Sequence, residues 1–434
     1  MPKELSNFSE IAARLGPSPT AVVHSAFAEP QTLLRQLAKA APLLHGARFY
    51  CLMPVRPPPY IQTEIEADAA ASFEVITFMP GAGLRRAVNS GQARVERCSF
   101  SAIPQFFSSA RSKVRLLLLQ VSPPDASGQV SLGITVDYMK AVLAKKPLVV
   151  AQINAHMPST CGDTLLPLAA LDYVFYHEED LVSTGAPREA DDGVDQVIAK
   201  HVAALVEPGD VLQAGIGALP DLVLAQLDHL RNLGGHTGIL SASWQRLIEN
   251  GVVNNSSKKE FRGATITTMA GGNAPFYRFL HRNPLVEFHP CSLTHSQKTL
   301  AAIDRLCAIS SVLQIDLAGN CNAEKVAGRV IAAPGGLPDF ARAASRLADG
   351  KSIIALRSSF FSKQQGKLVS NIVAAFPEHS PLSLPGCHVN FAVSEYGVAA
   401  LKGLSSSERA KALIGIAHPE HQAQLRRQLQ GKSC

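Results

Sequence analysis

The chain has 434 residues, of which 46% are hydrophobic and 18% are charged, and its net charge is +6. This length suits two domains, and this composition argues against intrinsic disorder. The basic residues are dispersed, which argues against a nucleic-acid interface, and no apolar run approaches the roughly 20 residues of a membrane span. The first residues lack the pattern of a secretory signal, and the eight cysteines include no Cys-x-x-Cys pair. We therefore expect a cytoplasmic protein with reduced thiols, no metal, no nucleic-acid partner and no membrane contact.

Apolar strands and helical stretches alternate along the chain. Short apolar runs bounded by Gly, Pro or polar residues predict buried strands at 114–121, 148–153, 312–317, 353–356 and 391–393. Amphipathic patterns predict helices at 31–41, 194–205 and 222–230. This alternation is typical of an α/β fold with largely parallel sheets.

One internal similarity predicts two related halves. Residues 28–37 and 218–227 share an Ala, a Pro, a Gln and two Leu in register, and an apolar run precedes each segment. The shared Pro stands where a helix is expected to begin, which is its favoured place. A polar segment at 184–193 has the composition of a linker. We therefore expect one domain at 1–190 and a second at 191–434.

Two glycine-containing segments are candidate ligand loops because each lies before a predicted helix. They are Gly215-Ile216-Gly217-Ala218-Leu219-Pro220 and Gly335-Gly336-Leu337-Pro338-Asp339-Phe340. Small residues permit a close backbone approach, and the free N–H groups at a helix start favour an anion. Each segment alone is also compatible with a simple turn, capped in the second case by Asp339.

Two further segments follow predicted strands. Pro123-Pro124 fixes a rigid loop after the strongest strand signal, at the edge of a sheet where α/β proteins bind ligands. Glu395 ends another strand, where it is either catalytic or part of an ion pair. Ser405-x-x-Glu408 predicts a capping box, and His418 is expected at a helix end rather than as a general base.

Taken in order, these segments resemble the acetyl-CoA hydrolase/transferase family, which includes acetate, succinate, 4-hydroxybutyrate and itaconate CoA-transferases. The resemblance runs from about Ser25 to Leu425. Its motifs are Val121-Ser122-Pro123-Pro124-Asp125, Gly215-Ile216-Gly217-Ala218-Leu219-Pro220, Asp316-Leu317-Ala318-Gly319, Gly335-Gly336-Leu337-Pro338-Asp339-Phe340, Ser394-Glu395-Tyr396-Gly397-Val398-Ala399 and Ile416-Ala417-His418-Pro419.

The resemblance implies two related open α/β domains with the active site in the cleft between them. It implies that coenzyme A or an acyl-CoA binds together with a second small-molecule substrate, and we expect a homodimer. The residues expected to contact CoA are Gly215, Ile216, Gly217, Ala218 and Leu219 at its acyl end, and Gly335, Gly336, Leu337 and Phe340 at its nucleotide end. Candidate catalytic residues are Gly215, Gly217, Glu29 and Glu395.

The residue that carries the family's covalent chemistry is missing. In the family, a glutamate after a His-Thr pair attacks the thioester and then holds CoA as a glutamyl thioester. Here the matching pair is His236-Thr237, and the similar segment at 247–255 sets the register without gaps. The glutamate position is therefore Gly238, which has no side chain to attack with.

Other departures from the family surround the expected cleft. The N-terminal Gly-x-Gly becomes Ala26-Phe27-Ala28, and Phe27 is expected to crowd the pocket. The family's Met-Pro-Arg ends in Ser159, and its Gly-Gly-Gln ends in Leu337. Altered site residues on a retained framework indicate a changed reaction or substrate.

Three interpretations follow from the missing glutamate. In the first, the chain is a CoA-transferase or acyl-CoA hydrolase in which another carboxylate serves or the acceptor attacks the thioester directly. The candidate carboxylates are Glu29, Glu64, Glu66 and Glu395. In the second, the chain catalyses a different acyl transfer or condensation on a CoA thioester. In the third, it is a non-catalytic CoA-binding subunit.

Overall fold

The computed structural model describes residues 1–61, 73–109, 112–184 and 193–431, which form two compact units. Unit 1 comprises Met1–Thr184, Ile266–Thr294 and Val330–Gly335, and unit 2 comprises Gly185–Thr265, His295–Arg329 and Gly336–Cys434. The predicted linker lies mostly outside the described residues. The division into domains at 1–190 and 191–434 stays a prediction.

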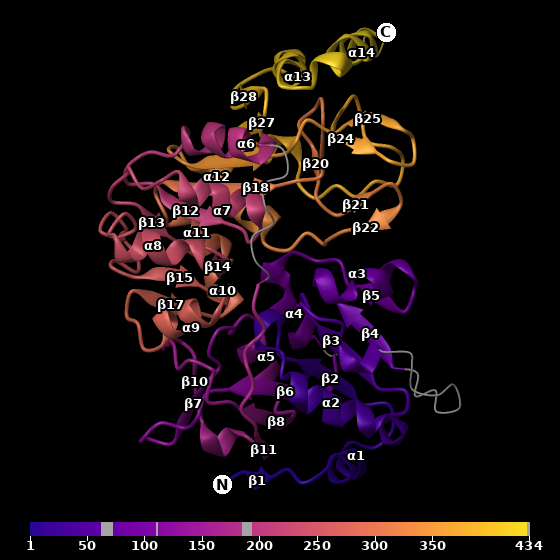
Figure 1. Ribbon diagram of the computed structural model, residues 1–434, viewed down its shortest axis with the longest axis vertical. Helices are drawn as coiled ribbons and strands as arrows, with labels where there is room; N and C mark the ends of the chain where they lie inside the picture. The colour runs from indigo at the N-terminus through magenta and orange to yellow at the C-terminus, as the bar shows by residue number, and fades with distance from the viewer. Residues whose placement is uncertain (62–72, 110–111, 185–192, 432–434) are drawn as a thin grey trace. The chain divides into compact units, whose positions relative to one another are not determined.

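Unit 1 is built on an eight-stranded sheet in which every pair of neighbours is parallel (Figure 1). In spatial order its strands are β1 (Lys3–Glu4), β11 (Tyr173–Tyr176), β8 (Leu148–Ile153), β6 (Val114–Val121), β2 (Thr20–Val23), β3 (Arg48–Cys51), β4 (Glu74–Thr77) and β5 (Ala93–Val95). The predicted strands at 114–121 and 148–153 are confirmed as β6 and β8. Their nearly continuous apolar sequences suit strands that helices cover on both faces.

The helices of unit 1 are α1 (Ser9–Leu15), α2 (Gln31–Lys39), α3 (Gly81–Asn89), α4 (Ile103–Ser108), α5 (Met139–Leu143), α9 (Ala274–Leu280) and α10 (Cys291–Thr294). Helix α2 buries Leu33, Leu34 and Leu37 in the core of the unit, at the spacing of one helix face. Short strands complete this part of the chain: β7 (Gln129–Ser131), β9 (Cys161–Gly162), β10 (Leu165–Pro167), β15 (Thr265–Thr267), β16 (Met269–Gly271) and β17 (Val286–Phe288).

Unit 2 is built on a six-stranded sheet that is parallel except for its last pair. In spatial order the strands are β13 (Gly234–Gly235), β12 (Val211–Ala214), β18 (Leu306–Ser311), β23 (Lys351–Ala355), β27 (Phe391–Ser394) and β28 (Gly397–Ala400). The predicted strands at 353–356 and 391–393 are confirmed as β23 and β27. The expectation of largely parallel sheets is therefore confirmed in both units.

One strand prediction is confirmed only in part. The apolar run at 312–317 forms only the short β19 (Gln314–Asp316) of a small side sheet, whereas β18 directly before it lies inside the main sheet. Strand β18 contains Cys307, Ala308 and two serines, so its apolar signal is weak although its first residues are fully buried. The remaining short strands are β14 (Ile239–Ser241), β20 (Cys321–Asn322), β21 (Lys325–Val326), β22 (Arg329–Val330), β24 (Ser359–Ser362), β25 (Lys367–Ser370) and β26 (Ile372–Val373).

The helices of unit 2 are α6 (Val194–Ala203), α7 (Ala218–Ala225), α8 (Ser243–Glu249), α11 (Gln297–Ala301), α12 (Leu337–Arg346), α13 (Ser406–Gly415) and α14 (Pro419–Gln430). The predicted capping box is confirmed, because Ser405 and Glu408 cap each other at the start of α13. His418 is the N-cap of α14, which confirms its predicted place at a helix end. Among the described residues, no helix is long and apolar enough to cross a bilayer.

Candidate functional site

The carboxyl edge of the unit 2 sheet carries the glycine loop predicted to face the ligand. Strand β12 ends at Ala214, and Gly217 is the N-cap of α7 with a φ of 140°. A Cβ atom added at Gly215 would meet no atom within 4 Å, and one at Gly217 would meet only Cδ of Pro220, at 3.9 Å. The loop is therefore open on its side-chain face, and Gly217 has a backbone conformation that other residues rarely adopt.

The His-Thr pair lies beside this loop. The backbone N–H of His236 donates to the carbonyl of Leu212 over 2.9 Å, and the hydroxyl of Thr237 donates to the carbonyl of Ala214 over 2.8 Å. These bonds hold the segment after β13 next to the end of β12, where α/β proteins place their ligands. Gly238 therefore lies at the same edge as the 215–217 loop.

The space next to Gly238 is filled by a residue that no sequence motif indicated. His295 follows α10 and is 1% exposed. A Cβ atom added at Gly238 would lie 2.7 Å from Nε2 of His295, and its next neighbour outside that ring is Phe340, at 3.6 Å. Burial, together with the nearby His236, lowers the pKa of His295 to about 3, so the imidazole is neutral at physiological pH.

The second glycine loop leads into α12. Gly335 has a φ of 55°, whereas Gly336, the N-cap of α12, has an ordinary φ of −84°. Phe340 is 1% exposed, and its ring meets that of His295 edge-on at a centroid distance of 4.8 Å. Gly336, Phe340 and His295 therefore belong to one cluster with Gly238. Leu337 is half-buried at the first helical position.

In unit 1, Glu29 and Phe27 are both buried. A Cβ atom added at Gly271 would collide with the ring of Phe27, so this ring packs directly on the backbone there. Glu29 is 1% exposed and accepts a hydrogen bond of 3.2 Å from Gln31. Burial raises the pKa of Glu29 well above its usual range, which favours the protonated form of this side chain. A neutral acid is a hydrogen-bond donor rather than a nucleophile.

The other candidate carboxylates have different settings. Glu395 accepts two hydrogen bonds from Ser358, one from its backbone N–H over 2.9 Å and one from its hydroxyl over 2.6 Å. It therefore joins the ends of β23 and β27. Glu64 and Glu66 lie outside the described residues. At the altered Met-Pro-Arg position, the backbone N–H of Ser159 donates to Nδ1 of His281 over 3.2 Å. The catalytic roles of these residues stay predictions.

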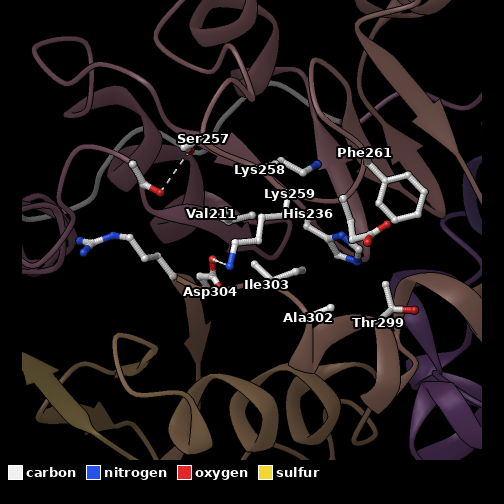
Figure 2. Close-up of a pocket in the computed structure, with 13 residues that line it drawn as sticks. Val211, His236, Ser257, Lys258, Lys259, Phe261, Thr299, Ala302, Ile303 and Asp304 are labelled. Atoms are coloured by element: carbon white, nitrogen blue, oxygen red, sulfur yellow. Dashed lines mark hydrogen bonds and ion pairs between the residues drawn. The ribbon is translucent and has the colours of Figure 1, made fainter.

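Residues of unit 2, among them His236, line a pocket of about 120 Å³ (Figure 2). Val211, Phe261 and Ile303 provide apolar lining, and two further lining residues, Lys259 and Asp304, form an ion pair of 2.8 Å. Of the residues predicted to bind CoA, none lines this pocket.

Sequence comparisons identify the family to which the chain belongs. The profile of the acetyl-CoA hydrolase/transferase N-terminal domain matches residues 2–184, and that of the C-terminal domain matches residues 272–429. The 4-hydroxybutyrate coenzyme A transferase of Clostridium kluyveri is 36% identical over 345 residues, which cover 80% of this chain and 79% of that protein. The chain belongs to the acetyl-CoA hydrolase/transferase family.

Two further comparisons extend over nearly the whole chain. The succinyl-CoA:acetate/propanoyl-CoA:succinate CoA transferase of Fasciola hepatica is 30% identical over 98% of this chain and 87% of its own. The crystal structure of RipA from Yersinia pestis superposes with a TM-score of 0.89 at 28% identity, covering 99% of this chain and 97% of RipA. This family member is therefore an enzyme of the CoA-transferase and hydrolase type, with CoA transfer as its general function.

Proposed function

We propose that this enzyme transfers CoA from an acyl-CoA thioester to the carboxylate of a second small molecule, without a glutamyl-CoA thioester at position 238. The observation that carries the proposal is the contrast at the carboxyl edge of unit 2. The 215–217 loop is open, whereas the neighbouring nucleophile position is a glycine with an imidazole against it. The relatives' chemistry supplies the substrate classes, a CoA thioester and a carboxylate.

The proposed reaction proceeds by direct attack. A carboxylate oxygen of the acceptor attacks the thioester carbonyl carbon, the C–S bond breaks, and a mixed anhydride and CoA thiolate form. The thiolate then attacks the acceptor-derived carbonyl of the anhydride and releases the donor as a carboxylate. Backbone N–H groups at the start of α7 suit the oxyanion that develops in each step, and the protein supplies positioning in place of a covalent bond.

Steady-state kinetics test this mechanism. The enzyme is incubated with acetyl-CoA or another short acyl-CoA, with and without acetate, succinate or itaconate, and free thiol and new acyl-CoA are measured. Direct attack requires both substrates together, so double-reciprocal plots are expected to intersect. Parallel lines would indicate a covalent intermediate. Borohydride treatment during turnover, followed by mass spectrometry, is expected to leave residues 236–240 without a CoA adduct.

Two other outcomes select the alternatives. A CoA adduct on Glu29, Glu64, Glu66 or Glu395 would show that the covalent role has moved to that residue. Release of free thiol with a new carbon–carbon bond in the product would instead show a condensation on the thioester. The expected homodimer is tested by light scattering on the active enzyme.

The ligand loops are part of the same proposal. We propose the acyl end of CoA near 215–219, supported by the open space at Gly215 and Gly217, and the nucleotide near 335–340, supported by the start of α12. A complex with CoA in which the nucleotide lies away from Gly335 and Gly336 would contradict the second placement.

Substitution of Gly217 tests the first placement. Gly217→Val adds a branched side chain to the open face and strains a φ of 140°, which moves the backbone donors. We expect a loss of kcat/KM of about 100-fold or more in a folded protein. Gly193 is a matched control, because it is the N-cap of α6 with a φ of 73° and no atom near its Cβ position. Gly193→Val is expected to lower the melting temperature and to retain activity. Full activity in Gly217→Val would show that the 215–217 loop is only a turn.

A further inference from the structure

The imidazole of His295 lies against two glycines from separate parts of unit 2. A Cβ atom added at Gly238 would lie 2.7 Å from Nε2 and 3.0 Å from Cε1. A Cβ atom added at Gly336 would lie 2.8 Å from the same Nε2 and 3.0 Å from Cδ2. Carbon atoms do not approach a ring this closely, so each contact requires a residue without a side chain.

The backbone does not require glycine at either position. Gly336 has a φ of −84°, and the φ of Gly238 also lies outside the +20° to +160° range that disfavours side chains. Gly217 and Gly335 differ, since their φ values are 140° and 55°. What requires glycine at 238 and 336 is therefore the space that His295 occupies.

The ring of His295 is held firmly in this place. It is 1% exposed and meets Phe340 edge-on, and Phe340 is itself buried in a hydrophobic cluster of unit 2 with Leu300 and Leu306. Buried rings in a packed core have little room to change rotamer. A side chain at 238 therefore has to displace part of this core.

We infer that the imidazole of His295 occupies the volume needed by a side chain at position 238. It thereby excludes a carboxylate at position 238 from the thioester, and in the proposed mechanism the attack is left to the carboxylate of the second substrate. This inference deepens the proposed function and rests on it for the identity of the reaction. The packing part of the inference is independent of any activity.

A thermal stability cycle tests the packing part. Gly238→Ala adds a single Cβ atom and is expected to lower the melting temperature by about 3–10 °C, because overpacking a core is destabilising. In a His295→Ala background the same substitution is expected to cost less than about 2 °C, because the obstructing atoms are gone. An equal loss in the two backgrounds would overturn the inference.

Gly335→Ala is the matched control for this cycle. Its strain arises from a φ of 55° and from Cε of Met79, which lies 2.8 Å from the added Cβ position. Removal of the His295 ring does not relieve either cause. We therefore expect Gly335→Ala to lower the melting temperature equally in the wild-type background and in the His295→Ala background.

Restoring the carboxylate tests the chemical part. Gly238→Glu alone is expected to show no CoA adduct at 236–240 after acyl-CoA and borohydride, whereas Gly238→Glu combined with His295→Ala is expected to show one. An adduct in the single variant would overturn the inference. Stability coupling without an adduct in the double variant would overturn its chemical part and keep its packing part. Failure of the proposed function itself is distinguishable, because then the wild-type enzyme transfers no CoA while the stability coupling remains.

Discussion

The two units both bury carboxyl groups, but they provide these groups with different partners. In unit 1, Glu29 and Asp137 are at most 1% exposed, and within the described residues neither forms an ion pair. In unit 2, Asp210 is equally buried but contacts two cations, Arg305 at 2.9 Å and Lys351 at 2.9 Å. Among the described residues, these buried carboxyl groups therefore lie without a cation in unit 1, whereas Asp210 contacts two cations in unit 2.

The pairing in unit 2 follows from its sheet. Asp210, Arg305 and Lys351 stand at the amino ends of β12, β18 and β23, which are consecutive neighbours in the sheet. Parallel strands in this register bring the three side chains to one edge, opposite the edge that carries the glycine loops. The cluster of Asp210, Arg305 and Lys351 therefore has a structural role.

The two buried acids of unit 1 differ from Asp210, because neither contacts a cation among the described residues. Asp137 accepts hydrogen bonds from the backbone N–H groups of Tyr138 and Met139, and burial raises its pKa to about 7. It also has a φ of 28°, which is unusual for a residue other than glycine. Desolvated carboxyl groups without a cation are costly, and groups with such raised pKa values cluster at functional sites. The comparison therefore indicates a stabilising role for Asp210, whereas burial favours the protonated forms of Glu29 and Asp137.

The largest expected effect is in unit 2. Asp210→Ala leaves Arg305 and Lys351 without their buried partner, and we expect a loss of about 3–5 kcal/mol in the free energy of unfolding. Glu207→Ala is the control, because Glu207 contacts the same two cations but is 59% exposed. It is expected to cost less than about 1 kcal/mol. Denaturant titration measures the loss of stability in each variant. Equal losses would contradict the expected difference between Asp210 and Glu207.

A smaller, pH-dependent effect is expected for Asp137. Its folded pKa of about 7 exceeds the ordinary value of 3.8, so between these values the folded state holds a proton that the unfolded state has released. The contribution of this group to stability therefore falls as pH rises from about 4 to 7 and is constant above that. The amide side chain in Asp137→Asn cannot ionise, so this variant lacks that contribution to the pH dependence of stability.

We expect Asp137→Asn to gain stability relative to wild type by about 2 kcal/mol between pH 5 and pH 8, measured by denaturant titration at each pH. Asp210→Asn serves as the comparison, since it removes the ion pair and is expected to be less stable than wild type at pH 8. A pH-independent difference between Asp137→Asn and wild type would show that Asp137 is ionised in the folded protein.

The smallest effect is expected for Glu29. A neutral acid and an amide have the same shape, so Glu29→Gln is expected to change the free energy of unfolding by less than about 1 kcal/mol and kcat by less than about threefold. Thermal melts and the CoA-transfer assay measure the two quantities. A large loss of kcat at unchanged stability would give Glu29 a role in the reaction, and a CoA adduct on Glu29 would then refute direct attack.

The sequence alone determined what depends on neighbours along the chain. The strands β6 and β8, the capping box of Ser405 and Glu408 and the glycine that begins α7 follow from local periodicity and local hydrogen bonding. The order of the family motifs likewise showed the family and the absence of a side chain at Gly238.

Only the tertiary structure showed which residue fills the space next to Gly238. His295 is 57 positions from Gly238 (295 − 238) and 41 from Gly336 (336 − 295), and no spacing rule connects them. Their contact arises because the segments after β13 and α10 and before α12 converge in one unit. The same holds for Asp210, whose cations come from other strands of the sheet. Side-chain volume and charge pairing between distant segments are set by packing, which local sequence patterns do not encode.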